Sequence, residues 1–359
     1  MNVLVLTRYG RQGASSRLRF LQYSPSLQRL GFNCTVEPLL NDQMLATKYR
    51  SGEYDRRQVM RAYWGRLLQL VGRRNFDLLW IEKEALPWIP AWLECALLHG
   101  VPYVLDFDDA VFHNYDLHRS KWVRRFLGRR IDRLMAGARL VVGGNDYLAQ
   151  RARDAGAPWV EVVPTVVDLE RYEVRPHPGT QRGAPHIVWI GSPSTVGYLA
   201  ALGAPLAALA QSVAFKVRVI GGVLEMPGVD IECVPWTEDT EVAFIAECDI
   251  GIMPLPDSPW ERGKCGYKLI QYMACGLPVV ASPVGVNTQI VQDGVNGFLA
   301  EEGGDWEAKL GQLLGDAVLR EAMGRAGRRR VEDEYCVQQV APRLAGLLLK
   351  AGGRQACAD

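Results

Sequence analysis

Two short apolar runs on either side of a helical segment constrain the fold of this chain more than any other feature. Residues 249–254 and 277–281 each have the length of a buried parallel strand. Between them lie a charged, Pro-containing loop over 255–263 and a helix expected over 264–275, which Gly276 is expected to end. A strand, loop, helix and strand in this order are typical of an open α/β sheet, in which ligands lie at the carboxyl ends of the strands.

The start of that expected helix indicates an anion site. Lys264, Gly266 and Tyr267 would lie in its first turn, where the backbone N–H groups and the helix dipole favour a negative charge. Lys264 and Lys268 have the spacing that places two ammonium groups on one side of a helix. A phosphate or diphosphate fits such a place, although two lysines at this spacing also occur on an ordinary solvated helix face.

The same alternation of strands and helices runs through the whole chain and predicts parallel, doubly wound sheets. A segment rich in Pro and Gly, residues 165–185, interrupts it and reads as an interdomain linker. Helices are expected over 17–30, 56–72, 88–99, 120–136 and 146–155 before the linker, and over most of 305–350 at the end of the chain; 41–55 is expected to be an irregular polar segment.

Composition narrows the class of protein. At 359 residues the chain has the length of two domains, and no apolar run reaches the ~18–20 residues of a membrane-spanning helix. A strand begins almost at Met1 without a secretory pattern, and the eight cysteines have no metal-ligand spacing, so we expect a cytoplasmic protein with free thiols. There is no GxGxxG, which disfavours a dinucleotide oxidoreductase.

Charge is distributed unevenly. Residues 1–153 carry a net charge of +10 and residues 154–359 a net charge of −9. The basic half contains two helices, at 56–74 and 120–136, with aromatic residues among their arginines, which suits peripheral contact with an anionic membrane at its inner face. A solvated helix face is the alternative, and no nucleic-acid motif is present, so nucleic acid is not an expected partner.

Four segments, in order, resemble a family-4 glycosyltransferase of the GT-B fold. They are VVPTVVDLERYE at 162–173, CDIGIMPL at 248–255, MACGLPVVAS at 273–282 and DGVNGFLA at 293–300. The resemblance implies an α/β protein of two Rossmann-like domains that face each other across a cleft. It assigns 1–165 to acceptor binding, 166–185 to the linker, 186–335 to nucleotide-sugar binding and 336–359 to a C-terminal helix that crosses back to the first domain.

The implied activity is transfer of a sugar, with retention, from a nucleotide-diphosphate-sugar to a glycan or lipid-linked acceptor in cell-surface polysaccharide or glycoconjugate synthesis. Such a hexosyltransferase-type enzyme needs no cofactor and no catalytic metal. A non-catalytic GT-B subunit that binds nucleotide-sugar or glycan is the main alternative. A GT-B epimerase is disfavoured by the linker and late-loop segments.

The donor site departs from the family pattern. The family has two glutamates eight positions apart, and this sequence has Gly263 and Gln271 there. Gln271 can hydrogen-bond a ribose hydroxyl, and Glu261 is a substitute for the first glutamate. The stretch that follows the first strand of the nucleotide-sugar domain, GSPSTVGYL at 191–199, lacks the usual cations. Lys264 and Lys268, with Arg218 or Arg262, are therefore expected to supply the positive charge that binds the diphosphate. The remaining expected donor contacts are Gly191, Ser192, Ser194, Thr195, Gly222, Trp236, Gly266 and Tyr267.

The acceptor side departs as well. Where relatives often have His in a TxHD context, this chain has Asp108 followed by Asp109, in GVPYVLDFDDAVF. The two carboxylates are expected to orient an acceptor hydroxyl or bind a cation, with helix capping or simple solvation in a loop as the alternative. His113 is a substitute for the missing His, and the loop Ser15, Ser16 and Arg17 is expected to touch an acceptor phosphate. Catalytic roles are therefore expected for Asp108, Lys264 and Lys268.

Overall fold

The structure is a computed structural model that describes residues 1–72, 75–172 and 183–353. It divides into two compact units. The first comprises Met1–Thr165, Gly263–Cys265 and the chain from Val340 onward, and the second comprises Val166–Arg262 and Gly266–Gln339. Much of the expected linker, including Pro176, Pro178 and Gly179, lies outside the described residues.

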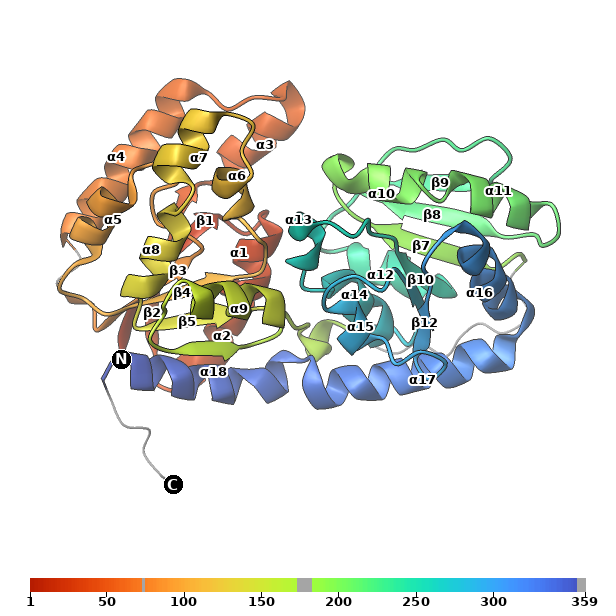
Figure 1. Cartoon of the computed structure of the whole chain (residues 1–359). Coiled ribbons are helices and arrows are strands. Elements are labelled where there is room, and N and C mark those ends of the chain that lie inside the picture. Colours follow the sequence, from red (N-terminus) through yellow and green to blue (C-terminus); the bar gives the residue numbers. More distant parts are fainter. Residues whose placement is uncertain (73–74, 173–182, 354–359) are drawn as a thin grey trace. The chain divides into compact units, whose positions relative to one another are not determined.

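The first unit contains a six-stranded parallel sheet in the order β2-β1-β3-β4-β5-β6. Its strands alternate with helices along the chain (Figure 1). The strands are β1 Asn2–Tyr9, β2 Asn33–Leu40, β3 Leu78–Glu82, β4 Tyr103–Phe107, β5 Leu140–Gly143 and β6 Val160–Val162. The helices are α1 Ala14–Arg19, α2 Ser24–Arg29, α3 Asp42–Ser51, α4 Arg56–Gly72, α5 Ala91–Leu98, α6 His113–Asp116, α7 Lys121–Leu127, α8 Arg130–Gly137 and α9 Asp146–Asp154.

The second unit contains another six-stranded parallel sheet, in the order β12-β11-β10-β7-β8-β9. Its strands are β7 His186–Ile190, β8 Lys216–Ile220, β9 Ile231–Val234, β10 Ile250–Met253, β11 Val279–Ala281 and β12 Gly297–Leu299. Its helices are α10 Val196–Ala200, α11 Gly203–Ala210, α12 Glu241–Ala246, α13 Pro259–Arg262, α14 Tyr267–Ala274, α15 Asn287–Ile290, α16 Gly303–Gly315 and α17 Ala317–Glu334. The predicted α/β class and its two Rossmann-like sheets are confirmed. The last helix, α18 Val337–Ala351, joins the first unit from Val340.

Each sheet has one place where the strand order reverses, and parallel α/β sheets bind ligands at the carboxyl ends of the strands there. In the first sheet this place lies between β1 and β3, and in the second between β10 and β7. The loops that follow Tyr9 and Glu82, and those that follow Ile190 and Met253, are therefore where functional side chains are expected to gather.

Several expected helices are shorter than the sequence pattern suggested. The segment 17–30 divides into α1 and α2, with Pro25 near the start of α2, where its missing N–H is harmless. The segment 120–136 divides at Gly128 and Arg129 into α7 and α8. The segment expected to be irregular contains α3, whose N-cap Asn41 accepts a hydrogen bond from the Met44 N–H.

Close packing in the second unit rests on small residues. A Cβ on Gly251 in β10 would lie 2.3 Å from the Tyr272 ring, and one on Gly324 in α17 would lie 1.9 Å from the Gly276 carbonyl oxygen. Glycine at these positions lets α14 lie against both the strand and α17. The Tyr272 hydroxyl accepts a hydrogen bond from the Ile190 N–H, which fixes the end of β7 to the same helix.

Among the described residues, no single helix is both long and apolar enough to cross a membrane. One bent pair, Pro193–Ala200 with Gly203–Ala210, meets the criterion of length and composition jointly.

Candidate functional site

In the second unit, the ends of β7 and β8 converge on the indole ring of Trp189. A Cβ on Gly191 would lie 2.4 Å from that ring, and one on Gly222 would lie 3.5 Å from it. The Lys268 ammonium lies 4.4 Å from the centroid of the same ring. Three of the expected donor residues, Gly191, Gly222 and Lys268, therefore surround one buried side chain near the carboxyl ends of the strands, close to the point where the strand order reverses.

The loop after β7 supplies hydroxyl groups. Ser192 and Ser194 are hydrogen-bonded through their Oγ atoms at 2.8 Å, and Thr195 Oγ1 donates to the Ser192 carbonyl at 3.0 Å. These contacts tie the expected donor residues Ser192, Ser194 and Thr195 into one turn before α10. Such a turn offers neutral hydroxyl donors to a phosphate, and Lys268 adds a cation beside it.

The expected helix start is corrected by the structure. The helix α14 begins at Tyr267, and Gly266 is its N-cap with a φ of 64°, a left-handed conformation that glycine adopts readily. A Cβ at Gly266 would lie 2.3 Å from Ile290 Cδ1, so this position also lacks space for a side chain. Lys264 therefore precedes the helix, and the expected helical spacing of Lys264 and Lys268 does not exist.

The tripeptide Gly263–Cys265 is embedded in the first unit. The Lys264 ammonium donates to Asp109 Oδ1 at 3.0 Å, and its carbonyl accepts from Asn145 Nδ2 at 2.8 Å. The Cys265 thiol contacts the Asp108 carbonyl at 3.2 Å. A Cβ on Gly263 would lie 2.5 Å from the Ala110 Cβ and 2.8 Å from its backbone nitrogen, so the glutamate of the family pattern has no room here.

The other two residues considered in place of the glutamate pair are both buried. Gln271 is 2% exposed and donates from Nε2 to the Tyr172 hydroxyl, which also lies 3.5 Å from the Tyr267 hydroxyl. Glu261 is 7% exposed and accepts hydrogen bonds from the Tyr198 hydroxyl at 2.6 Å and from the Ser258 hydroxyl. Glu261 lies on α13 after β10, on the side of the sheet where the strand order reverses.

Arg218 does not serve the expected phosphate role. It lies in the middle of β8, and its guanidinium pairs with Glu232 at 2.8 Å and with Glu247 at 2.7 Å, so its charge is already met away from the carboxyl end of the strand. Arg262 forms a two-pronged pair with Asp257 at 2.6 and 2.9 Å. Trp236 donates its indole N–H to Glu241 and lies beside Gly221 after β8.

In the first unit, Asp108 and Asp109 follow β4 and face a lysine that the sequence reasoning missed. The Lys83 ammonium lies 2.8 Å from Asp108 Oδ1 and 3.7 Å from Asp109 Oδ2, and it donates to Ser15 Oγ at 3.1 Å. Burial raises the pKa of Asp108, but the Lys83 ammonium outweighs it, so this pKa lies below its ordinary value. Asp108 is thus an ionised carboxylate rather than a general base poised near neutrality.

Two other expected acceptor residues, Ser16 and Arg17, make hydrogen bonds within the first unit. Ser16 is buried, donates to Glu82 Oε2 at 2.6 Å and accepts from the Tyr9 N–H. Arg17 is 4% exposed and donates to the Arg11 carbonyl. Direct contact of these two side chains with an acceptor phosphate is therefore unsupported, because both residues are almost fully buried.

His113, the expected substitute for the missing family histidine, makes two hydrogen bonds within the first unit. Its Nδ1 lies 2.8 Å from Asp116 Oδ1 and its Nε2 lies 2.8 Å from the Tyr147 hydroxyl, so both ring nitrogens are engaged within the unit.

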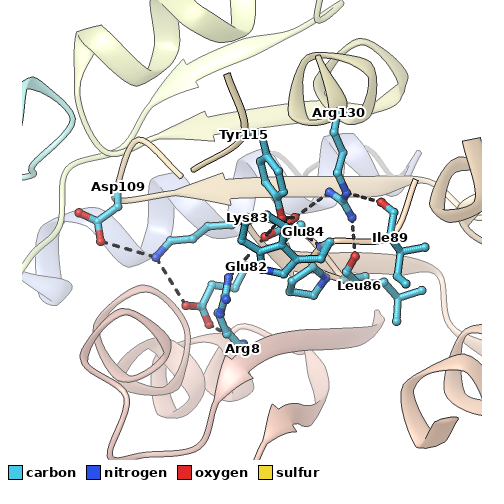
Figure 2. A network of polar contacts seen from close by, with 12 residues as sticks. Arg8, Glu82, Lys83, Glu84, Leu86, Ile89, Asp109, Tyr115 and Arg130 are labelled. Atoms are coloured by element: carbon cyan, nitrogen blue, oxygen red, sulfur yellow. Dashed lines mark hydrogen bonds and ion pairs between the residues drawn. The ribbon is translucent and has the colours of Figure 1, made fainter. Parts of the chain in front are cut away.

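Three successive charged residues at the end of β3, Glu82, Lys83 and Glu84, are all buried. Figure 2 shows their polar contacts. Glu82 accepts from the Arg8 N–H, Lys83 reaches the carboxylates after β4, and Glu84 accepts from the Tyr115 hydroxyl and from Arg130. Arg130 also contacts Glu94 and the carbonyls of Leu86 and Ile89, so it closes the loop that follows the strand. A run of three charged residues directly after an apolar strand was the signal in the sequence.

Two family models match the chain. The model described as "Glycosyltransferase Family 4" covers residues 39–171, and the one described as "Glycosyl transferases group 1" covers residues 184–316. The Family 4 match lies almost entirely in the first unit. The group 1 match lies in the second unit, except for the tripeptide 263–265.

Individual proteins agree with these models. The chain is 31% identical over 107 residues to an uncharacterized glycosyltransferase of Methanocaldococcus jannaschii, a match that covers 28% of this chain and 29% of the relative. It is 26% identical over 275 residues to a D-inositol 3-phosphate glycosyltransferase of Pseudarthrobacter chlorophenolicus, covering 68% of this chain and 64% of the relative. The chain thus spans less than two thirds of either relative.

Among solved structures, the fold is similar to that of Anabaena HepE in complex with UDP and glucose. The TM-score is 0.74 at 16% identity, and the superposition covers 98% of this chain and all of the other. At this identity the likeness establishes the fold. The two family models identify the chain as a family-4 glycosyltransferase, and its fold is GT-B.

Proposed function

We propose that this protein transfers a sugar, with retention and without a metal, from a nucleotide-diphosphate-sugar to a hydroxyl group of a glycan or lipid-linked acceptor. The observation that carries the donor half of this proposal is the cluster around Trp189. There Gly191, Gly222 and Lys268 gather beside the hydroxyl-rich turn Ser192–Thr195, at the edge of the sheet where nucleotides bind in this architecture. The relative HepE has been solved with UDP-glucose, which supports a donor of this class.

The chemistry asks the protein chiefly to position reactants and to stabilise charge on the departing diphosphate. Lys268, the hydroxyls of Ser192 and Thr195, and the first turn of α14 provide donors for that charge. In front-face transfer the leaving phosphate itself helps to remove the acceptor proton. Asp108, which the Lys83 ammonium holds as a carboxylate, therefore serves to orient the acceptor hydroxyl.

A binding module without turnover is the second candidate function. The observation that favours it is the packing of Gly263 against Ala110, which leaves no space for the first glutamate of the family, while Gln271 takes the place of the second. Glu261 favours the enzyme, because a buried carboxylate held by Tyr198 and Ser258 lies near the same edge of the sheet as the other expected donor contacts.

The acceptor side of the proposal includes an anionic membrane surface. The rings of Trp122 and Phe126 on α7 stack with centroids 5.9 Å apart, and their exposed fractions are 70% and 67%. No residue of α7 is buried, and the helix also carries Lys121, Arg124 and Arg125. An apolar pair beside basic side chains suits the headgroup region of a bilayer, and such contact would bring a lipid-linked acceptor to the enzyme from the cytoplasmic side.

The experiment that tests the donor is thermal stabilisation by a panel of nucleotide-sugars and free nucleotides, followed by transfer assays with whichever stabilises most. A ligand that binds the native state raises the melting temperature by mass action. One diphosphate-sugar should stand out, and its sugar should then appear on an acceptor. Stabilisation without any turnover would instead support the binding module, and no stabilisation by any nucleotide would overturn both.

A further inference from the structure

Lys83 has a backbone conformation that a side chain disfavours. Its φ is 62°, and Trp88 is the other non-glycine residue with positive φ in the described part of the chain. A residue with a Cβ in this region costs on the order of 1 kcal/mol or more, and such residues cluster at functional sites. Lys83 keeps the conformation because its N–H donates to the Asp106 carbonyl at 2.9 Å and the Glu84 N–H donates to the Glu82 carbonyl at 2.6 Å.

The turn directs the Lys83 side chain to where three loops meet. Ser15 follows β1, Lys83 follows β3 and Asp108 follows β4, so the ammonium joins the carboxyl ends of three neighbouring strands. Glu82 Oε1 also lies 3.9 Å away. Burial lowers the pKa of the Lys83 ammonium, but Asp108, Asp109 and Glu82 outweigh that effect and raise it, so the side chain stays charged.

Exposure shows which atoms a ligand would meet. The Lys83 side chain is 6% exposed, whereas Asp108 is 12% and Asp109 is 25% exposed. Lys83 therefore lies on the inner side of the cluster. The two carboxylates lie on the outer side, where Lys264, 24% exposed, pairs with Asp109. Carboxylate oxygens accept hydrogen bonds from hydroxyl groups and repel phosphate, so the arrangement suits a polyhydroxylated ring better than an anionic headgroup.

We propose that Lys83 is the positioning residue of the acceptor site, that it acts through Asp108 and Asp109, and that this site takes hydroxyl groups of a sugar ring and not a phosphate. The proposal rests on the proposed function and replaces the expectation that the loop after β1 contacts an acceptor phosphate. Lys83 itself need not touch the acceptor, because its ammonium is almost fully covered.

The first test separates the effect of the Lys83 charge from the effect of its strained backbone conformation. Lys83→Asn keeps a residue that tolerates positive φ but removes the charge, and Lys83→Arg keeps the charge. With the donor found by thermal stabilisation, and with neutral p-nitrophenyl glycosides and sugar phosphates as acceptors, Lys83→Asn should lower kcat/KM for the glycosides by about tenfold or more. The Kd of the nucleotide should stay unchanged, and Lys83→Arg should recover part of the loss.

A double-mutant cycle asks whether Lys83 acts through Asp108. If it does, Lys83→Asn should have much less effect in an Asp108→Asn background than in the wild type. Two losses that multiply independently, a comparable loss of nucleotide affinity, or a wild-type preference for sugar phosphates would each overturn the proposal.

The second test does not depend on turnover. In protein labelled with ¹³C at aspartate carboxyls, the Asp108 resonance, assigned by its loss in Asp108→Asn, should remain at the ionised position to lower pH in the wild type than in Lys83→Asn. The titratable and charged groups that face Asp108 are Arg19 on α1, Glu82 at the end of β3, Lys83 after β3, Asp106 on β4, Asp109 after β4 and Cys265 of the embedded tripeptide.

The two tests keep different failures apart. Identical Asp108 titrations in the wild type and Lys83→Asn would overturn the positioning role whether or not the protein is an enzyme. A wild type that no nucleotide stabilises would overturn the proposed function, while a shifted Asp108 titration would still support the role of Lys83 in fixing the carboxylate.

Discussion

Lys264 and Asp109 form an ion pair of 3.0 Å within the first unit, although Lys264 lies in sequence between two helices of the second. Both side chains are about one quarter exposed. A diphosphate that recruits Lys264 must therefore compete with the Asp109 carboxylate for the same ammonium.

This competition predicts opposite effects for the two partners. Lys264→Ala should weaken binding of nucleoside diphosphates far more than binding of nucleosides, whereas Asp109→Asn should strengthen diphosphate binding by releasing the ammonium. Calorimetric titration with UDP, GDP and their nucleosides measures both effects. An equal loss of nucleoside and diphosphate affinity in Lys264→Ala would remove this residue from the phosphate site.

Lys268 should contribute to diphosphate affinity because the Trp189 ring holds its ammonium at the end of β7. We expect Lys268→Ala to weaken UDP or GDP binding by about tenfold, the effect of losing one charge-assisted hydrogen bond. Lys350→Ala is the matched control, since Lys350 lies 4.7 Å from the Trp159 ring centroid in the first unit. A similar loss in both variants would point to a general effect of charge.

Glu94 should make the stability of the first unit depend on pH. Burial raises its pKa from 4.5 to about 7, although Arg130 opposes the shift. Between these two values the folded state binds more protons than the unfolded state, so the free energy of unfolding falls as the pH rises through that window. The melting temperature of the wild type should therefore fall relative to that of Glu94→Gln between pH 5 and pH 8, and parallel curves would contradict this.

The contact between Gly324 and the Gly276 carbonyl should be intolerant of a single methyl group. Gly324→Ala should destabilise the second unit by about 1–3 kcal/mol through overpacking of α17 against the end of α14. Gly346→Ala in α18 is the control, because a Cβ there meets no atom within 4 Å and alanine favours the helix by up to about 1 kcal/mol. Thermal unfolding distinguishes them, and equal melting temperatures would refute the packing argument.

Membrane contact through α7 predicts selective loss of vesicle binding. The double variant Trp122→Ser, Phe126→Ser should float less with vesicles that contain phosphatidylserine than the wild type does. Val318→Ser, which removes a 76% exposed apolar side chain from α17, should bind as the wild type. Wild-type binding that is equal on neutral and anionic vesicles would argue against the role of the basic side chains.

The sequence predicted the sheets well because strand length and apolar character are local properties. The run 249–254 corresponds to β10 and 277–281 contains β11, and each lies fully buried in a parallel sheet. Helix boundaries were less predictable. The left-handed conformation of Gly266 starts α14 three residues later than expected, and a glycine in a sequence does not reveal the sign of its φ.

The residues of the candidate site were predictable only where the local sequence alone indicates a role. Asp108 and Asp109 were recognised because adjacent carboxylates after a strand are visible in the sequence. Lys83 was not, because its importance comes from a positive φ and from partners 68 and 25 positions away. The ion pairs of Arg218 were not predictable, because a strand residue in the sequence gives no indication of the glutamates that neighbouring segments bring to it.

The division of the chain into interleaved units has a consequence for evolution and for engineering. Residues 1–165 alone would lack the lysine that pairs with Asp109, the Arg343 that pairs with Glu161 and the Lys350 that covers Trp159. Recombination at the linker alone, made to exchange acceptor specificity, would therefore transfer a first unit that lacks two of its segments. A functional chimera needs three further crossovers, so that the tripeptide 263–265 and the chain from Val340 onward come from the same parent as residues 1–165.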